Sequence, residues 1–164
     1  MVYINKNEAF TRLNNIFNNK QAGFEYLRNT LIFERMLDEV ITFNRKINWE
    51  SNSANLKLVT TAEEFIKICN LRSEIYGNLG YQKEFPDFLP NMNFDFYDLN
   101  SAIIYNLTNS EITATCRLIF DSDKKLPIEE KLDLSSIRSK FQNIAEVSRL
   151  MVKKEQKGLN LDFK

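Results

Sequence analysis

Six charged residues stand at positions where the hydrophobic pattern of the sequence predicts burial. They are Arg72, Asp95, Asp98, Arg117, Glu146 and Arg149. An unpaired charge is unfavourable inside a protein, so three acids and three bases in such places are expected to neutralise one another in a cluster. The alternative interpretation is a purely structural ion-pair network, or charges that are solvated at the surface.

A carboxylate in such a cluster has a defined chemical use. Glu146 can take a proton from an ammonium group, directly or through water, and so prepare an amine for attack on a carbonyl carbon. The arginines can orient the acids or hold a substrate carboxylate through two parallel hydrogen bonds. Ser148 is not expected to be a nucleophile, because the sequence contains no histidine that could act as its base.

The composition excludes several other classes of site. Without histidine there is no Ser-His-Asp or Cys-His catalysis and no histidine metal site. Cys69 and Cys116 are far apart and lack the C-x-x-C spacing, so both are expected to be small core residues and no metal site is predicted. The four glycines form no phosphate-binding loop motif, and no permanently bound cofactor is expected.

The overall charge and hydropathy indicate a globular protein. The 22 basic and 22 acidic residues cancel, which gives no long-range attraction to nucleic acid, and 43% of the residues are hydrophobic. No apolar run reaches the roughly 20 residues that cross a bilayer, and the N-terminus lacks the layout of a secretion signal. We therefore expect a cytoplasmic protein with no membrane span.

The first part of the chain is expected to be helical. Apolar residues recur at helical spacing in residues 10–17 and again, as a broad stripe, in residues 24–41. This stripe is expected to pack on the core, although a separate protein-interaction arm is an alternative. The polar stretch 48–55 marks the boundary between an N-terminal helical segment, residues 1–50, and a second domain, residues 56–164.

The second domain combines strands with one long helix. The helix is expected to begin with the capping box of Thr61 and Glu64 and to end near Gly77 or Gly80. The predicted strands are residues 56–59, 101–107, 111–120 and 144–152, with short helices at 127 and at 134–141. Strict alternation places Glu146 and Arg149 on opposite faces of the last strand, so a β-bulge is needed to bring them together.

The order of four motifs within residues 56–155 resembles the N-terminal half of acyl-homoserine-lactone synthases and long-chain N-acyl amino acid synthases. The motifs are LRSEIYGNLGY, FDFYDLNSA, TATCRLIF and EVSRLMV. The resemblance implies the first half of a GCN5-related N-acyltransferase (GNAT) fold. This is a mixed α/β fold with a mainly antiparallel twisted sheet and flanking helices.

The resemblance also implies a site. Glu146 and Arg149 would be catalytic, with the glutamate as general base. The amine substrate would be held by Arg72, Tyr76, Tyr81, Asp95, Asp98 and Arg117. The acyl donor would be bound by Leu150, Met151 and Val152, and by a turn at Gly158. Two positions depart from the family pattern, since Tyr81 is displaced by one residue and Glu155 replaces the usual Gln or Arg of that turn.

The implied reaction transfers a fatty-acyl group from a coenzyme A or acyl-carrier-protein thioester to the amine of an amino acid or of S-adenosylmethionine. The product would be an N-acyl amino acid or an acyl-homoserine lactone, and the lysines at 153, 154, 157 and 164 would face an acidic carrier protein. Family members continue beyond the fourth strand, so the alternative is a non-catalytic binding or regulatory module that retains part of the fold. The unpaired edge of that strand predicts a homodimer, or cover by the N-terminal helices.

Overall fold

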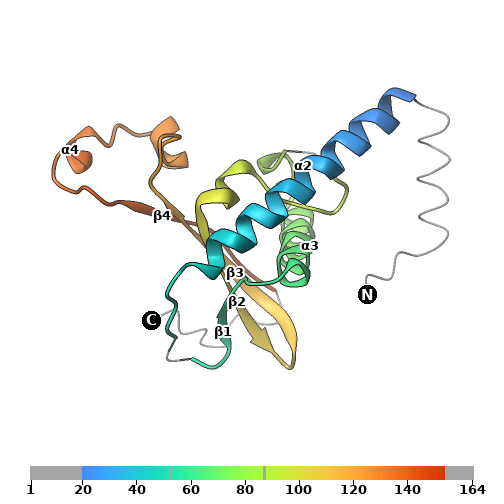
Figure 1. Ribbon diagram of the computed structural model, residues 1–164, viewed down its shortest axis with the longest axis horizontal. Helices are drawn as coiled ribbons and strands as arrows, with labels where there is room; N and C mark the ends of the chain where they lie inside the picture. The colour runs from blue at the N-terminus through green and yellow to red at the C-terminus, as the bar shows by residue number, and fades with distance from the viewer. Residues whose placement is uncertain (1–19, 52, 87, 154–164) are drawn as a thin grey trace.

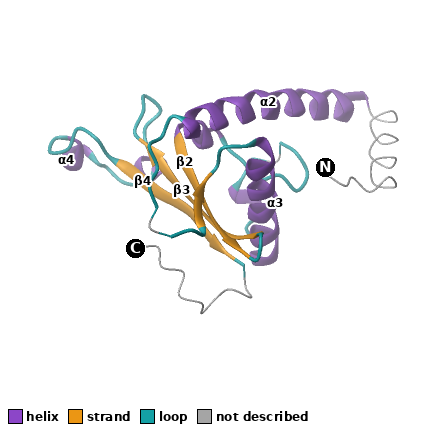
Figure 2. Ribbon diagram, turned by 60° about the horizontal axis from the view of Figure 1, so that its bottom comes forward, coloured by secondary structure: helices purple, strands orange, loops and turns teal. Residues whose placement is uncertain are grey.

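The computed structural model describes residues 20–51, 53–86 and 88–153. The elements are α2 (Lys20–Arg45), β1 (Leu56–Leu58), α3 (Ala62–Leu79), the 3-10 helices η1 (Gln82–Glu84) and η2 (Phe96–Asn100), β2 (Ser101–Thr108), β3 (Glu111–Phe120), the 3-10 helix η3 (Pro127–Glu130), α4 (Ser135–Arg138) and β4 (Ala145–Val152). The strands form one antiparallel sheet in the order β1-β2-β3-β4 (Figures 1 and 2). This mixed α/β architecture confirms the predicted first half of a GNAT-like fold.

Helix α3 begins and ends where its sequence predicts. Thr61 and Glu64 form the reciprocal capping box, and Gly80 closes the helix in the left-handed conformation with a φ of 76°. Its buried stripe includes Phe65, Ile68 and Arg72, which follow one another at helical spacing. Leu79 lies in the last turn and is exposed.

Helices α2 and α3 and the sheet share one hydrophobic core. Phe33 of α2 stacks on Phe65 of α3 with ring centroids 6.1 Å apart, and it also contacts Phe94 at 4.9 Å. Ile103 and Tyr105 of β2 belong to the same cluster of buried side chains. The apolar stripe of the N-terminal segment therefore packs on the core, as expected, from Phe33 onward.

The first half of α2 departs from the prediction. Phe24, Leu27 and Leu31 are exposed by 74%, 57% and 66%. The physical reason is that this half of the helix extends past the end of the sheet and α3, so no described element lies beneath it (Figure 1). The predicted helix over residues 10–17 lies outside the described residues.

The β2–β3 hairpin fixes which face of the sheet Arg117 occupies. Asn109 and Ser110, with φ of 51° and 66°, form a two-residue turn between the paired residues Thr108 and Glu111. In the resulting register Arg117 lies opposite Ile103, a core residue. Because cross-strand partners share a face, Arg117 points toward α3 and away from the Cys116 face, as the alternation predicts.

Strand β4 forms the outer edge of the sheet over the residues that the structure describes. Helix α2 packs on β2, η2 and α3, so it does not provide the expected cover for this edge. The homodimer that the edge predicts stays a prediction. Among the described helices, none is long and apolar enough to cross a membrane.

Asn44 joins α2 to the beginning of β2. Its side chain is fully buried, and its Nδ2 donates to the carbonyl oxygens of Val40 and Ser101 at 2.9 and 3.0 Å. Its Oδ1 accepts from the backbone N–H of Ile103 at 2.9 Å. Since Ser101 directly follows η2, this amide holds α2 against the segment that carries the acidic pair.

Replacing Asn44 by Ala is expected to lower the free energy of unfolding by about 3 kcal/mol, because a buried N–H and a buried carbonyl lose their partner. Urea unfolding followed by circular dichroism measures this difference. The matched control is Asn70→Ala on the exposed side of α3, which should change stability by less than about 0.5 kcal/mol. Equal stability of both variants would contradict the anchoring role of Asn44.

Candidate functional site

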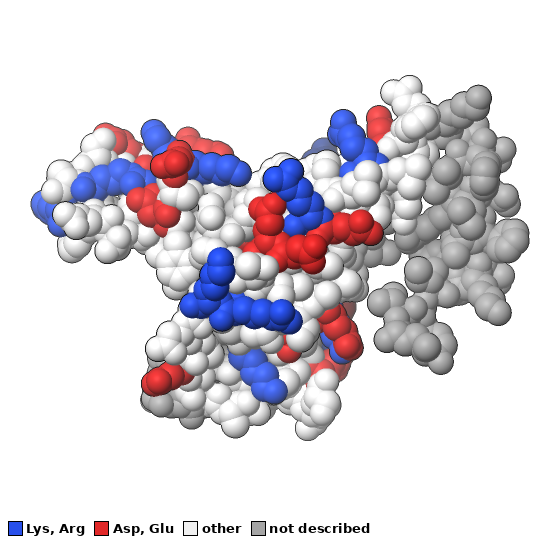
Figure 3. Space-filling model, in the orientation of Figure 1, with Lys and Arg blue, Asp and Glu red and all other residues white. Residues whose placement is uncertain are grey.

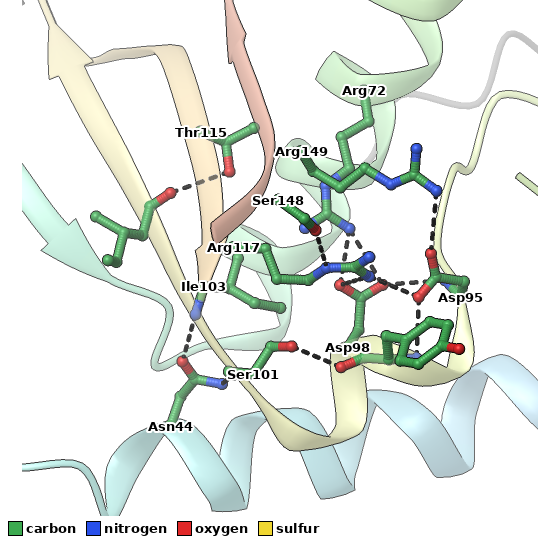
Figure 4. Close-up of polar contacts among 12 residues, drawn as sticks. Asn44, Arg72, Asp95, Asp98, Ser101, Ile103, Thr115, Arg117, Ser148 and Arg149 are labelled. Atoms are coloured by element: carbon green, nitrogen blue, oxygen red, sulfur yellow. Dashed lines mark hydrogen bonds and ion pairs between the residues drawn. The ribbon is translucent and has the colours of Figure 1, made fainter. Parts of the chain in front are cut away.

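A buried carboxylate, Asp98, lies between two buried arginines. Arg72 Nη1 donates to Asp98 Oδ1 and Oδ2 at 3.0 and 3.1 Å, and Arg117 Nη1 donates to Asp98 Oδ1 at 3.0 Å (Figure 4). The exposed fraction is 0% for Arg72 and Asp98 and 1% for Arg117. The three residues come from α3, η2 and β3, so this ion cluster connects three elements that are distant in sequence.

The D-x-x-D sequence has a local structural cause. Asp95 is the N-cap residue of η2, and its side chain accepts from the backbone N–H of Tyr97 at 2.9 Å. Asp98 Oδ2 accepts from the backbone N–H of Asp95 at 3.0 Å, which completes a reciprocal capping box. Both carboxylates are therefore fixed by the backbone as well as by the arginines.

Asp95 extends the cluster toward the fourth strand. Its Oδ1 accepts from Arg117 Nη1 at 2.5 Å, and its Oδ2 lies 3.5 Å from Arg149 Nη2. Arg117 Nε donates to the Ser148 hydroxyl at 3.2 Å. The Ser148 hydroxyl thus joins β4 to Arg117.

A β-bulge in β4 brings Arg149 into this cluster. Thr115 pairs with Met151 and Arg117 pairs with Ser148, so three steps along β4 oppose two steps along β3. Arg149 takes the extra place with a φ of 54°, a conformation that is uncommon for a residue other than glycine. The bulge that the sequence required for Glu146 and Arg149 to share a face is therefore present.

Arg149 is held by aromatic and polar partners at once. Its guanidinium lies 4.0 Å from the ring centre of Phe85, and its Nη1 donates to the Tyr76 hydroxyl at 3.0 Å. Its Nη2 donates to the carbonyl oxygen of Glu84 at 3.0 Å. These contacts attach the loop after α3 to β4 and fix the direction of the arginine.

A cavity of about 480 Å³ opens beside these residues. It is lined by Tyr76, Glu84, Pro86, Asp95, Phe96, Tyr97, Arg117, Pro127, Glu130, Lys131, Glu146, Ser148 and Arg149. The backbone holds one carboxylate oxygen of Glu146: Oε2 accepts from the N–H of Ile128 at 2.9 Å. No ion pair to Glu146 occurs among the described residues.

Two of the buried groups, Asp98 and Arg117, keep their ionised forms. Burial by itself would raise the pKa of Asp98, but Arg72 and Arg117 outweigh it and the pKa is lowered. Burial opposes the charged form of Arg117 as well, yet Asp98 and Asp95 raise its pKa. Burial and the neighbouring Glu130 raise the pKa of Tyr97, whose hydroxyl stays protonated and donates to Glu130 Oε1 at 3.3 Å.

The face of the molecule in Figure 3 carries both signs of charge in alternation. Acidic and basic side chains gather together on the body and on the segment between β3 and β4, and neither sign covers the face. This distribution agrees with the zero net charge of the sequence.

Residues 67–161, more than half of the chain, match the protein family described as N-acyl amino acid synthase FeeM. The chain belongs to the FeeM family. The matched segment begins in α3 and contains all six charged residues of the predicted cluster. No curated protein and no solved structure matches the sequence.

The structure brings five of the predicted site residues of this FeeM family member to the cavity wall. Tyr76, Asp95, Arg117, Glu146 and Arg149 line it. Arg72 and Asp98 lie behind the wall, fully buried, so they reach a ligand only through Asp95 and Arg117. Whether these residues act on a substrate stays a prediction.

Other predicted residues lie away from the cavity. Tyr81 is 56% exposed, packs edge-on against Tyr76 and does not line the wall. Leu150 is 59% exposed at the bulge, whereas Met151 and Val152 are back in register with β3. Gly158, Glu155 and the lysines at 154, 157 and 164 lie outside the described residues. Cys69 and Cys116 are buried and unpaired, as expected.

Several lining residues were not found from the sequence. Glu84, Phe96, Tyr97, Glu130 and Lys131 reach the cavity from loops and 3-10 helices. Periodicity cannot identify such residues, because they belong to no repeating face. The available signal for Tyr97 was its place inside the D-x-x-D capping box.

Replacing Asp98 by Asn is expected to lower the free energy of unfolding by about 3–5 kcal/mol at pH 6, because two buried guanidinium groups lose their shared carboxylate. Since the pKa of Asp98 is lowered in the folded protein, its contribution is complete above the unfolded-state pKa of about 3.9 and is lost as the pH falls toward the folded-state value.

The difference in unfolding free energy between the wild type and Asp98→Asn should therefore shrink by about 1 kcal/mol between pH 6 and pH 3. Urea unfolding at the two pH values measures it. The control is Asp123→Asn. It removes an exposed carboxylate and should leave the free energy of unfolding nearly unchanged at both pH values. A deficit of Asp98→Asn that does not change with pH would show that the carboxylate is not held by these charges.

Proposed function

We propose that the protein transfers a fatty-acyl group from an acyl thioester, carried by an acyl carrier protein or coenzyme A, to the amine of an amino acid. The product is an N-acyl amino acid. Membership of the FeeM family supports this reaction class. The observation that carries the proposal is the position of Glu146 and Arg149 on one wall of the cavity, made possible by the bulge in β4.

The charges that line the cavity suit an amino acid. Four carboxylates face three basic side chains there, and Arg117 is already committed to Asp95 and Asp98. An ammonium group is therefore attracted toward the acidic side of the cavity. Lys131 supplies positive charge for the carboxylate of the same substrate, and Arg149, which is already bonded to Tyr76, Glu84 and Asp95, adds to it.

Glu146 is the proposed general base. The substrate ammonium gives one proton to the carboxylate, directly or through a water molecule, and the free amine then attacks the thioester carbonyl carbon. The C–N bond forms, the C–S bond breaks, and the second proton that the nitrogen loses is taken up by the departing thiolate. The N–H of Ile128 occupies only Oε2 of Glu146, which leaves Oε1 for the proton.

The bulge supplies candidates for stabilising the oxyanion of the tetrahedral intermediate. Arg149 and Leu150 lie between the last paired residue, Ser148, and the next, Met151. A residue inserted by a bulge is left out of the ladder, so its backbone N–H is free to donate elsewhere. The proposed oxyanion donors therefore shift from the predicted donor-binding stretch, residues 150–152, to the peptide groups of Arg149 and Leu150.

The direct test incubates the purified protein with a panel of acyl-carrier-protein and coenzyme A thioesters, each with amino acids or S-adenosylmethionine, and identifies products by mass spectrometry. An N-acyl amino acid is expected. An acyl-homoserine lactone would reassign the acceptor, and the absence of any product with every pair would favour the alternative of a non-catalytic binding module.

Replacing Glu146 by Gln is expected to slow product formation at least about a hundredfold, because the amide still accepts from Ile128 but cannot take a proton. The matched control is Glu39→Gln on the exposed side of α2, which should retain activity within about twofold. Turnover of Glu146→Gln at the wild-type rate would remove this residue as the base.

A further inference from the structure

The segment between β3 and β4, residues 121–144, projects from the end of the sheet and contains η3 and α4 (Figure 1). We call it the β3–β4 arm. Its η3 end forms one side of the cavity, through Pro127, Glu130 and Lys131. The arm holds little of the hydrophobic core, since Leu126 is its only fully buried hydrophobic residue, so its position must be fixed by polar contacts.

Arg138 of α4 makes those contacts. Its guanidinium Nη1 and Nη2 donate to Asp121 Oδ2 and Oδ1 at 2.6 and 2.8 Å. On the other side, Nε and Nη2 donate to Glu129 Oε1 and Oε2 at 2.8 and 2.5 Å. A single planar group thus joins the beginning of the arm, η3 and α4 by two bidentate pairs.

We call these two ion pairs of Arg138 the clamp. The clamp acts on η3 directly. Glu129 Oε2 also accepts from the backbone N–H of Leu126 at 2.8 Å, which fixes the first turn of η3. The hydrogen bonds from Arg138 and Leu126 lower the pKa of Glu129 to about 2, so its carboxylate is ionised at any working pH. Ile128 directly precedes Glu129, and its backbone N–H donates to Glu146 Oε2.

We infer that Arg138 is a positioning residue for Glu146, acting through Glu129 and the N–H of Ile128. Arg138, Asp121 and Glu129 do not line the cavity, so they do not contact a ligand there. The functional part of this inference rests on the proposed role of Glu146 as base. A shift of about 1 Å in a reacting group can reduce a rate on the order of a hundredfold, so a remote clamp can matter.

A double-mutant cycle separates positioning from a general effect on folding. Arg138→Gln alone should lower kcat about tenfold, because η3 and with it Glu146 lose their fixed place. In the Glu146→Gln background the same change should lower kcat by less than about twofold, since no base remains to be positioned. An equal loss in both backgrounds would overturn the inference, because a structural defect acts regardless of Glu146.

Two further variants complete the set. Arg138→Lys keeps the positive charge but not the planar fork, and should lie between the wild type and Arg138→Gln. Arg35→Gln removes an exposed arginine that pairs with Glu39 on α2, and should behave as the wild type. A loss with Arg35→Gln as large as with Arg138→Gln would also overturn the inference.

Amide hydrogen exchange tests the mechanical link without any turnover. In ¹⁵N-labelled Arg138→Gln, the Ile128 amide should exchange at least about tenfold faster than in the wild type, while the buried Ile103 amide should not change. Unchanged exchange at Ile128 overturns the inference. Faster exchange in a protein that forms no acyl product would support the link from Arg138 to Glu146 and refute the proposed function.

Discussion

The carboxylate of Asp98 between Arg72 and Arg117 is the interaction on which the rest of the site depends. Removing these groups from water is unfavourable, and such a buried cluster is weak evidence for net stability. Its effect is geometric, because it fixes α3, η2 and β3 relative to one another. With Asp95 included the cluster carries no net charge, because two acids face two arginines.

The positions of the cavity residues follow from that arrangement. Once Arg117 is held by Asp98, its second carboxylate partner, Asp95, must stand at the inner wall of the cavity. The bulge in β4 then aims Arg149 at the same carboxylate and at Tyr76. The buried layer thus orients a second layer of charged groups that faces the cavity, and the second layer is the part suited to contact a substrate.

Much of this arrangement could be predicted from local patterns. Arg72 follows Phe65 by seven residues, so helix periodicity places both on the same face of α3. Arg117 and Cys116 are neighbours in β3, so strand alternation places their side chains on opposite faces of the sheet. The need for a bulge between Glu146 and Arg149 was also readable. Its presence was not, because a bulge depends on the register with β3 rather than on the sequence of β4 alone.

The predictions that were wrong, and the residues that were not found from the sequence, have physical causes of a different kind. The stripe of Phe24, Leu27 and Leu31 has helical spacing, but spacing does not reveal where the supporting sheet ends. Residues of the short 3-10 helices, such as Glu84 and Glu130, come to the cavity by tertiary contacts alone. Arg138 lies in a polar segment where an arginine is normally solvated, and only the fold shows that it joins Asp121 to Glu129.

We propose that acyl transfer takes place in this cavity, beside Glu146. A crystal structure of the protein with a bound N-acyl amino acid tests it most directly. We expect the amide nitrogen of the ligand within about 3 Å of the Glu146 carboxylate, or one water molecule away. A ligand bound outside the cavity, with Glu146 remote from its amide, would contradict the claim.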